Sequence, residues 1–188
     1  MKKVAEKHDL ACLLHEKPFR GVNGSGKHNN WSLTTDTGHN LFSPGKEPET
    51  NKQFQLFMCA VIRAVDENQD LLRISVATAG NDRRLGGNEA PPAIISMFLG
   101  DYITNILTSV EEGHGAGEWN AEKMETGVAS VPEFMKDKSD RNRTSPFAFT
   151  GNKFEFRMLG SSNSIACANI MLNAAVAESL KIYADRLE

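Results

Sequence analysis

Cysteine is scarce in this 188-residue sequence, which contains only Cys12, Cys59 and Cys167. The three lie far apart without the spacing of a zinc knuckle or a redox pair, so we expect buried thiols in a reducing compartment. The net charge of −3 argues against a nucleic-acid-binding surface as the main function. We find no signal-peptide pattern, and no apolar run approaches the ~20 residues of a membrane span. We therefore expect a cytoplasmic protein.

The overall composition is that of an ordinary globular protein, with 40% hydrophobic and 24% charged residues. The length fits one domain, with at most a small appendage. Neither an internal repeat nor a low-complexity tract interrupts it.

Residues 17–32 form a glycine-rich stretch between two expected strands, at 10–15 and 30–35. Glycine lets a backbone approach a ligand closely, and exposed N–H groups in such a turn suit anions. His28 adds an imidazole that can bind a metal, and Lys27 adds a positive charge. A plain glycine-rich hairpin connection explains the same composition, and the spacing alone leaves both interpretations open.

Apolar periodicity predicts helices at about 54–65 and 71–79, and a longer one that opens at Pro91 and runs to about Val110. Residues 80–92 are expected to form a loop. Serines at 161–164 offer a cap for a final long helix.

The segment 153–158 alternates charged and apolar residues, as a strand does when its two faces differ. Lys153, Glu155 and Arg157 would share one face. This face is either a solvated charge ladder or the lining of a cleft that offers two cations and one carboxylate. With Arg84, Arg141, Arg143 and the loop residue Glu89, the cleft interpretation indicates an anionic, phosphorylated small-molecule substrate with a divalent metal.

Four segments resemble glutamine synthetase in order and spacing, most closely its type III branch. The first contains Lys17-Pro18-Phe19, Asn23-Gly24-Ser25-Gly26, His28 and Ser32, like the family's ATP-region signature. The second, residues 81–91, is similar to the glutamate flap. The third and fourth, residues 140–147 and 152–157, resemble the arginine loop and the strand that binds metal and substrate.

The resemblance implies a role for each matching residue. The metal, Mg²⁺ or Mn²⁺, would be bound by His28 and Glu155. The substrate glutamate would be bound by Asn23, Gly24, Arg84 and Arg157. ATP would be bound by Asn30, Ser32, Arg143 and Lys153. Glu89 and Arg143 would be catalytic, Glu89 by deprotonating ammonium and Arg143 by stabilising the transferred phosphoryl group.

The implied activity is that of a glutamate–ammonia ligase with glutamate, ammonia and ATP as substrates and γ-glutamyl phosphate as intermediate. The implied fold is α+β, with a curved, mainly antiparallel sheet and helices packed outside it. A homo-oligomer is expected for the full-length enzyme, with no nucleic-acid or membrane partner.

The sequence also departs from the family pattern. Asn30 stands where many members carry a second histidine, and nothing before Lys17 resembles the glutamates that supply the other metal ligands. We therefore expect residues 1–188 to be a partial catalytic domain without the family's N-terminal β-rich domain. Two alternatives remain open: a truncated, non-catalytic nucleotide-binding module, and a related ATP-dependent ligase or guanidino kinase.

Overall fold

A mixed four-stranded sheet organises the computed structural model, which describes residues 1–113, 123–124, 134–135 and 145–188. The strand order is β1 (Gly26–Trp31), β6 (Phe154–Gly160), β5 (Phe147–Phe149) and β2 (Met97–Phe98). β6 pairs antiparallel with both β1 and β5, whereas β2 pairs parallel with β5. A separate two-stranded sheet joins β3 (Lys123–Met124) and β4 (Phe134–Met135).

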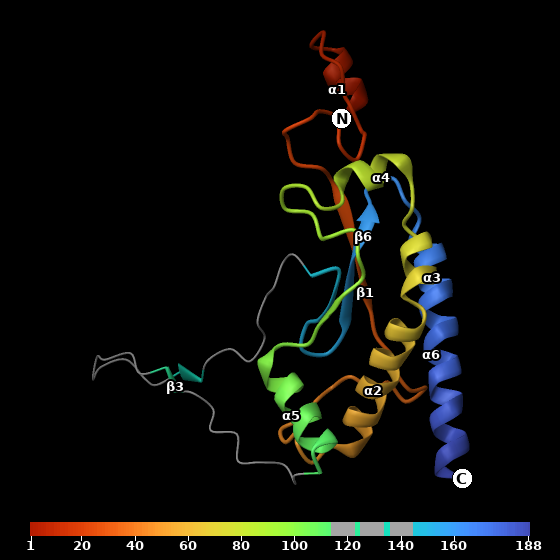
Figure 1. Cartoon of the computed structure of the whole chain (residues 1–188). Coiled ribbons are helices and arrows are strands. Elements are labelled where there is room, and N and C mark those ends of the chain that lie inside the picture. The colour runs from red at the N-terminus through yellow and green to blue at the C-terminus, as the bar shows by residue number, and fades with distance from the viewer. Residues whose placement is uncertain (114–122, 125–133, 136–144) are drawn as a thin grey trace.

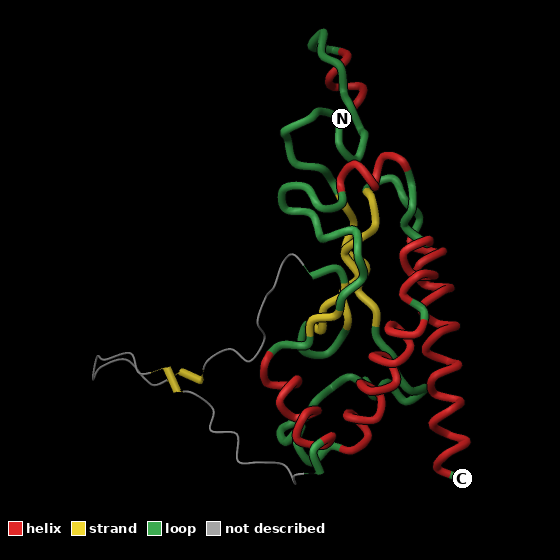
Figure 2. The backbone as a smooth tube through the Cα atoms, viewed as in Figure 1, coloured by secondary structure: helices red, strands yellow, loops and turns green. Residues whose placement is uncertain are grey.

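Six helices accompany the sheet within the described residues, which confirms the α+β class. They are α1 (Lys2–Glu6), α2 (Lys52–Glu67), α3 (Gln69–Ile74), α4 (Ala79–Arg84), α5 (Asp101–Glu111) and α6 (Ile165–Leu187). The helices α2, α3 and α6 lie side by side along one side of the sheet, and α4 lies at the end of β6 (Figures 1 and 2). The expected curvature of the sheet stays a prediction.

Phenylalanines dominate the core between the sheet and the helices. Phe147 and Phe154, on neighbouring strands, stack with their ring centroids 5.0 Å apart, and Phe42 meets Phe154 edge to face at 5.2 Å. Phe54 of α2 lies 6.0 Å from Phe149. Such aromatic pairs add to the free energy gained from burying their large apolar surface. The result is a rigid support for the opposite, polar side of β6.

Two asparagines on α6 fix that helix against β1. Asn29 donates to Asn169 Oδ1 at 2.7 Å, and Trp31 Nε1 donates to Asn173 Oδ1 at 2.8 Å. Four helical residues rise by about 6.0 Å and two strand residues by about 6.6 Å, so the two spacings match. The predicted cap is confirmed, because Ser164 Oγ accepts from the Ala166 N–H at 3.2 Å.

By length and composition alone, α6 could cross a membrane, which the sequence analysis did not expect. One such helix is weak evidence, because a core helix can pass the same test. Leu172 and Val176 are buried in the hydrophobic core, and the two asparagines bond to β1. These contacts account for the buried face of α6, whereas Ile165, Ile170 and Leu187 are exposed.

Three expectations at the N-terminal end and among the cysteines need correction. Residues 10–15 form no strand, and Leu10, Leu13 and Leu14 are exposed. The following strand begins earlier than expected, at Gly26 inside the glycine-rich stretch. Cys59 and Cys12 are half-buried and Cys167 is exposed, so the expectation of buried thiols is wrong for Cys167. Burial raises the pKa of the Cys59 thiol.

In the middle of the chain, the structure also differs from what the apolar periodicity predicts. Residues 79–84 form α4 instead of a loop, with Thr78 accepting from the Asn81 N–H. The helix expected from Pro91 begins only at Asp101. Gly100 precedes it with a φ of +78°, a left-handed backbone conformation that favours glycine. The chain changes direction at this residue, before the helix begins. Upstream, the half-buried residues Met97 and Phe98 form β2, which pairs with β5, and a helical pattern cannot reveal this pairing.

Candidate active site

His28 and Glu155, which are 127 positions apart, meet on the neighbouring strands β1 and β6. His28 Nδ1 lies 2.8 Å from Glu155 Oε1. A bulge between Lys27 and Asn29 shifts the register, so that Asn30 pairs with Glu155 and His28 lies at the irregularity. Bulges commonly re-aim a side chain beside a functional site. The strand pairing thus brings together the two residues predicted as metal ligands.

Arg157 completes this group from the same strand as Glu155. Its Nε donates to Glu155 Oε2 at 3.0 Å and its Nη2 lies 2.9 Å from the same oxygen. Burial works to raise the pKa of Glu155, but the hydrogen bond and charge of Arg157, followed by those of His28, outweigh it. The pKa of Glu155 is therefore lowered, and the carboxylate is ionised at neutral pH.

The donor set fits part of a site for a hard cation. The side chain of His28 is 53% exposed and that of Glu155 is 18% exposed, so both are accessible. Mg²⁺ commonly takes one or two carboxylates and completes its shell with water and substrate phosphates. Within the described residues, no group of three or more His, Cys, Asp or Glu side chains could hold a metal. His28 and Glu155 would therefore supply two ligands of a site that needs others.

A second contact joins the glycine-rich stretch to the predicted flap. Asn23 Nδ2 donates to Glu89 Oε2 at 2.8 Å, across 66 positions of sequence. Glu89 has a φ of +57°, in the left-handed region that non-glycine residues rarely adopt. Such backbone strain persists only where the surroundings hold it, and it is common at functional sites. A predicted substrate ligand and the predicted ammonium base thus lie together.

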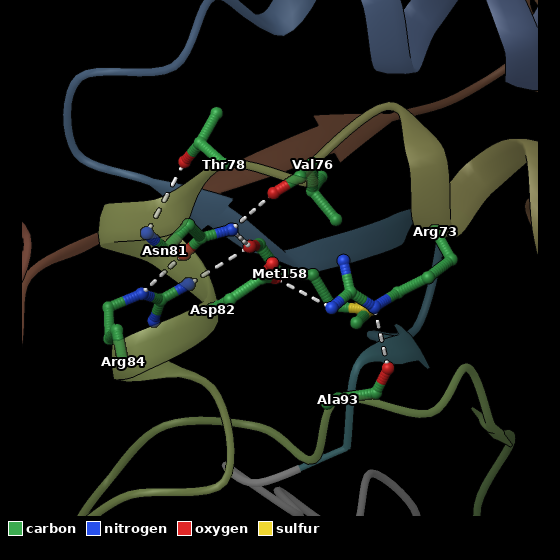
Figure 3. A network of polar contacts seen from close by, with 8 residues as sticks. All are labelled: Arg73, Val76, Thr78, Asn81, Asp82, Arg84, Ala93 and Met158. Carbon is green, nitrogen blue, oxygen red and sulfur yellow. Dashed lines mark hydrogen bonds and ion pairs between the residues drawn. The ribbon is translucent and has the colours of Figure 1, made fainter.

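Arg84, predicted to bind substrate, is buried at 4% exposure and bonded inside the protein. Its Nε donates to Asn81 Oδ1 at 2.9 Å, and its Nη2 donates to the carbonyls of Met158 at 3.0 Å and Leu159 at 3.1 Å (Figure 3). Burial lowers the pKa of Arg84, and the negative charge of Glu16 opposes this. These bonds join α4 to β6, so Arg84 has a structural position here and its substrate contact stays a prediction.

Arg84 also explains the glycines that the sequence analysis assigned to ligand approach. A Cβ added at Gly24 would lie 2.5 Å from Arg84 Cγ, and one at Gly26 would lie 2.6 Å from Arg84 Nη1. Real Cβ atoms do not come so close to other heavy atoms. Both glycines therefore make room for an internal side chain of the protein. The predicted contact of Gly24 with substrate stays a prediction.

The sequence analysis missed Glu16, a buried carboxylate at 7% exposure. It accepts hydrogen bonds from the N–H group of Ser162 at 3.2 Å and from the Ser162 hydroxyl. Gly80 and Gly160 leave space for its side chain, since an added Cβ would lie 2.7 Å and 2.9 Å from Glu16 atoms. Because these partners are distant in sequence, no local pattern marks Glu16.

The residues predicted to bind ATP are only partly brought together. Asn30 and Ser32 line a groove of about 550 Å³ between β1 and α6. Ser32 Oγ donates to Asn40 Oδ1 at 2.9 Å. Lys153, half-buried, precedes β6 in the turn. Arg143, like Arg141 and the rest of the predicted arginine loop up to residue 144, lies outside the described residues.

Comparisons with known proteins agree with these segments. A family model described as the glutamine synthetase catalytic domain matches residues 1–95. The type-3 glutamine synthetase of Dictyostelium discoideum is 54% identical over 187 residues, which are 100% of this chain and 25% of that protein. The glutamine synthetase of Bacteroides fragilis is 54% identical over 186 residues, covering 97% of this chain and 26% of the relative. The glutamine synthetase of Butyrivibrio fibrisolvens is 63% identical over 155 residues, covering 82% of this chain and 22% of the relative. The chain thus spans about a quarter of the length of these relatives.

Proposed function

The chain belongs to the glutamine synthetase family, and on this basis we propose that it forms part of the catalytic domain of an ATP-dependent glutamate–ammonia ligase. One observation carries the proposal: His28 and Glu155 meet at 2.8 Å on neighbouring strands, although 127 residues separate them. A solvated charge ladder would not require this pairing. Cytoplasmic location and homo-oligomeric assembly stay predictions.

In the first step, the γ-carboxylate of glutamate attacks the γ-phosphorus of ATP, and ADP leaves. A divalent cation bound at His28 and Glu155 would neutralise charge on the phosphate oxygens. Arg157 keeps Glu155 ionised and oriented, because its Nε and Nη2 both lie against the same carboxylate oxygen. Arg157 is itself buried at 5% exposure, which limits its freedom, so the carboxylate is held before any ligand arrives.

In the second step, ammonia attacks the acyl carbon of γ-glutamyl phosphate and inorganic phosphate leaves. Ammonium must first lose a proton, and the exposed carboxylate of Glu89 is a suitable acceptor. The hydrogen bond from Asn23 holds that carboxylate beside the glycine-rich stretch. Glu89 and Asn23 would therefore lie close together in the site.

A second candidate, binding without turnover, is favoured for the 188-residue chain by itself. The described residues contain no group of three metal-ligating acidic, histidine or cysteine side chains. A cation held by two protein ligands binds weakly and with poor geometry. We expect the isolated chain to form little or no γ-glutamyl hydroxamate from glutamate, ATP and hydroxylamine.

A chimera tests the proposed function directly. This chain would replace the matching segment of the Dictyostelium type-3 enzyme, with which it is 54% identical. We expect an active chimera, and Glu155→Gln should lower its kcat/KM about 100-fold through loss of a metal ligand. Glu67→Gln is the matched control, since Glu67 forms a surface ion pair with Arg63 on α2.

The chimera also has outcomes that contradict the proposal. One is a folded, assembled chimera that makes no glutamine. The other is wild-type activity in the Glu155→Gln chimera, which would remove Glu155 from the site. Equal loss of activity in the Glu67→Gln control would show that the effect of Glu155→Gln is not specific to the site.

A further inference from the structure

The loop that carries Glu89 runs from Leu85, just after α4, to Ser96, just before β2. Two backbone bonds shape it, from Gly86 N to Pro91 O at 2.9 Å and from Ala90 N to Gly87 O at 3.3 Å. Since Glu89 has a φ of +57°, the loop must be held from outside to keep this strained conformation. The anchors at its two ends, together with the hydrogen bond from Asn23, therefore fix where the Glu89 carboxylate lies.

The entrance of the loop is anchored through α4. Asn81 Nδ2 donates to the carbonyls of Val76 and Met158, both at 2.8 Å (Figure 3). Arg84 adds its bonds to the carbonyls of β6. These side chains are buried, so the entrance is fixed to the sheet whatever happens at the exit.

The exit of the loop has fewer means of attachment. Pro91 and Pro92 have no N–H group, so this part of the backbone can be tied only through carbonyl oxygens. The Pro91 carbonyl is taken by Gly86 N–H, which closes the loop on itself. The Ala93 carbonyl accepts from Arg73 Nε of α3 at 2.8 Å, which ties the exit to a different element (Figure 3).

The same guanidinium also reaches the entrance. Arg73 Nη2 donates to Asp82 Oδ1 of α4 at 2.6 Å. One planar fork on α3 thus joins Asp82, before the loop, to Ala93, near its exit. A guanidinium can make these two bonds in fixed relative directions, whereas a lysine ammonium is a point charge without that geometry.

We propose that Arg73 is a positioning residue that fixes the Glu89 loop by clamping Ala93 to Asp82. The proposal rests on the proposed function in giving Glu89 its role with ammonium. A surface ion pair with only a local effect is the rival explanation. The Arg73 and Asp82 side chains are 28% and 47% exposed, and such pairs add little to the free energy of unfolding. The two explanations therefore differ in loop order far more than in stability.

Hydrogen exchange of the 188-residue chain tests the clamp without any activity. In Arg73→Met, which removes both bonds, the Gly86 amide should exchange about tenfold faster, with α2 and β6 amides unchanged. Asp82→Asn keeps the Arg73–Ala93 bond and should change Gly86 exchange by less than about threefold. Arg73→Lys, a variant that preserves charge, should fall between the two. Unchanged Gly86 exchange in both Arg73 variants would overturn the proposal.

Kinetics of the chimera then test the effect on chemistry. Arg73→Met should raise the KM for ammonium about tenfold and leave the KM for ATP unchanged, because only the Glu89 loop moves. In a Glu89→Gln background, Arg73→Met should have no further effect, since the group that it positions is gone. Equal increases in both KM values would indicate a general structural defect and overturn the positioning role. If Glu89→Gln leaves activity intact while Gly86 exchange responds to Arg73, the role of Glu89 with ammonium fails and the clamp stands. If the chimera folds and makes no glutamine while Gly86 exchange still responds to Arg73, the proposed function fails and the clamp stands.

Discussion

Two carboxylate–arginine neighbourhoods contact β6 at different places, and they differ in what they leave accessible. Glu155 and Arg157 lie on the strand itself, with Glu155 next to an exposed histidine. Glu16 and Arg84 lie behind the glycine-rich stretch, where Glu16 bonds to Ser162 and Arg84 to backbone carbonyls. The same chemical groups thus form a candidate ligand site in one place and an internal brace in the other.

The difference follows from what surrounds each carboxylate. One oxygen of Glu155 contacts His28 and the other accepts from Arg157. A cation could therefore bind between Glu155 and His28 in place of their direct contact. Glu16 is enclosed by glycines and a serine that leave no room for a ligand. A carboxylate and an arginine in a family motif therefore indicate chemistry only when the fold leaves one of them reachable.

The largest effect is expected when the brace is broken. Glu16→Ala removes the acceptor of Ser162 and leaves Arg84 buried without a nearby negative charge. A buried donor left without its acceptor costs about 1–3 kcal/mol in the free energy of unfolding, and Glu16 accepts from two donors of Ser162. Urea denaturation of the 188-residue chain measures this loss directly.

Glu16→Gln is the matched control, because it keeps an oxygen for Ser162 and removes only the charge. We expect it to lose about half as much stability as Glu16→Ala. A Glu16→Ala chain as stable as the wild type would show that Glu16 and Arg84 do not depend on each other.

The glycine-rich stretch provides the next comparison. Gly24→Ala places a Cβ 2.5 Å from Arg84 Cγ and 2.7 Å from the carbonyl oxygen of Glu16, so atoms must shift. Overpacking of this kind costs about 1–3 kcal/mol, again measured by urea denaturation. The cost should shrink in an Arg84→Ala background, since much of the clash is then gone. Additive effects of the two substitutions would contradict the contact.

Much of the site followed from sequence because strand alternation is a local signal. The period of residues 153–158 placed Glu155 and Arg157 on β6, and the resemblance paired Glu155 with His28. The helix α2 and the Ser164 cap were likewise predictable from apolar period and capping chemistry. These features depend on neighbours within a few residues, which is the information that one sequence contains.

Contacts between distant segments were not predictable in the same way. The burial of Glu16 depends on Gly80 and Gly160, and no sequence pattern near Glu16 predicts its contact with these glycines. The apolar residues after Pro92 fit a helix equally well, and only pairing of β2 with β5 decides against it. Arg73 carries no motif either, since its partners are a backbone carbonyl and an exposed aspartate.

The smallest effect concerns the charge of Glu155 and depends on pH. Because the pKa of Glu155 is lowered in the folded chain, its carboxylate adds stability above its ordinary pKa of about 4.3. This contribution is lost as the pH falls through the lower folded value. Glu155→Gln should therefore cost about 1 kcal/mol near neutral pH, and the difference from wild type should shrink steadily below about pH 4.3. Urea denaturation of both chains between pH 7 and pH 3 measures it. A difference that stays constant across this range would mean that Arg157 and His28 do not favour the ionised carboxylate, and the contrast with the Glu16 brace would lose its electrostatic basis.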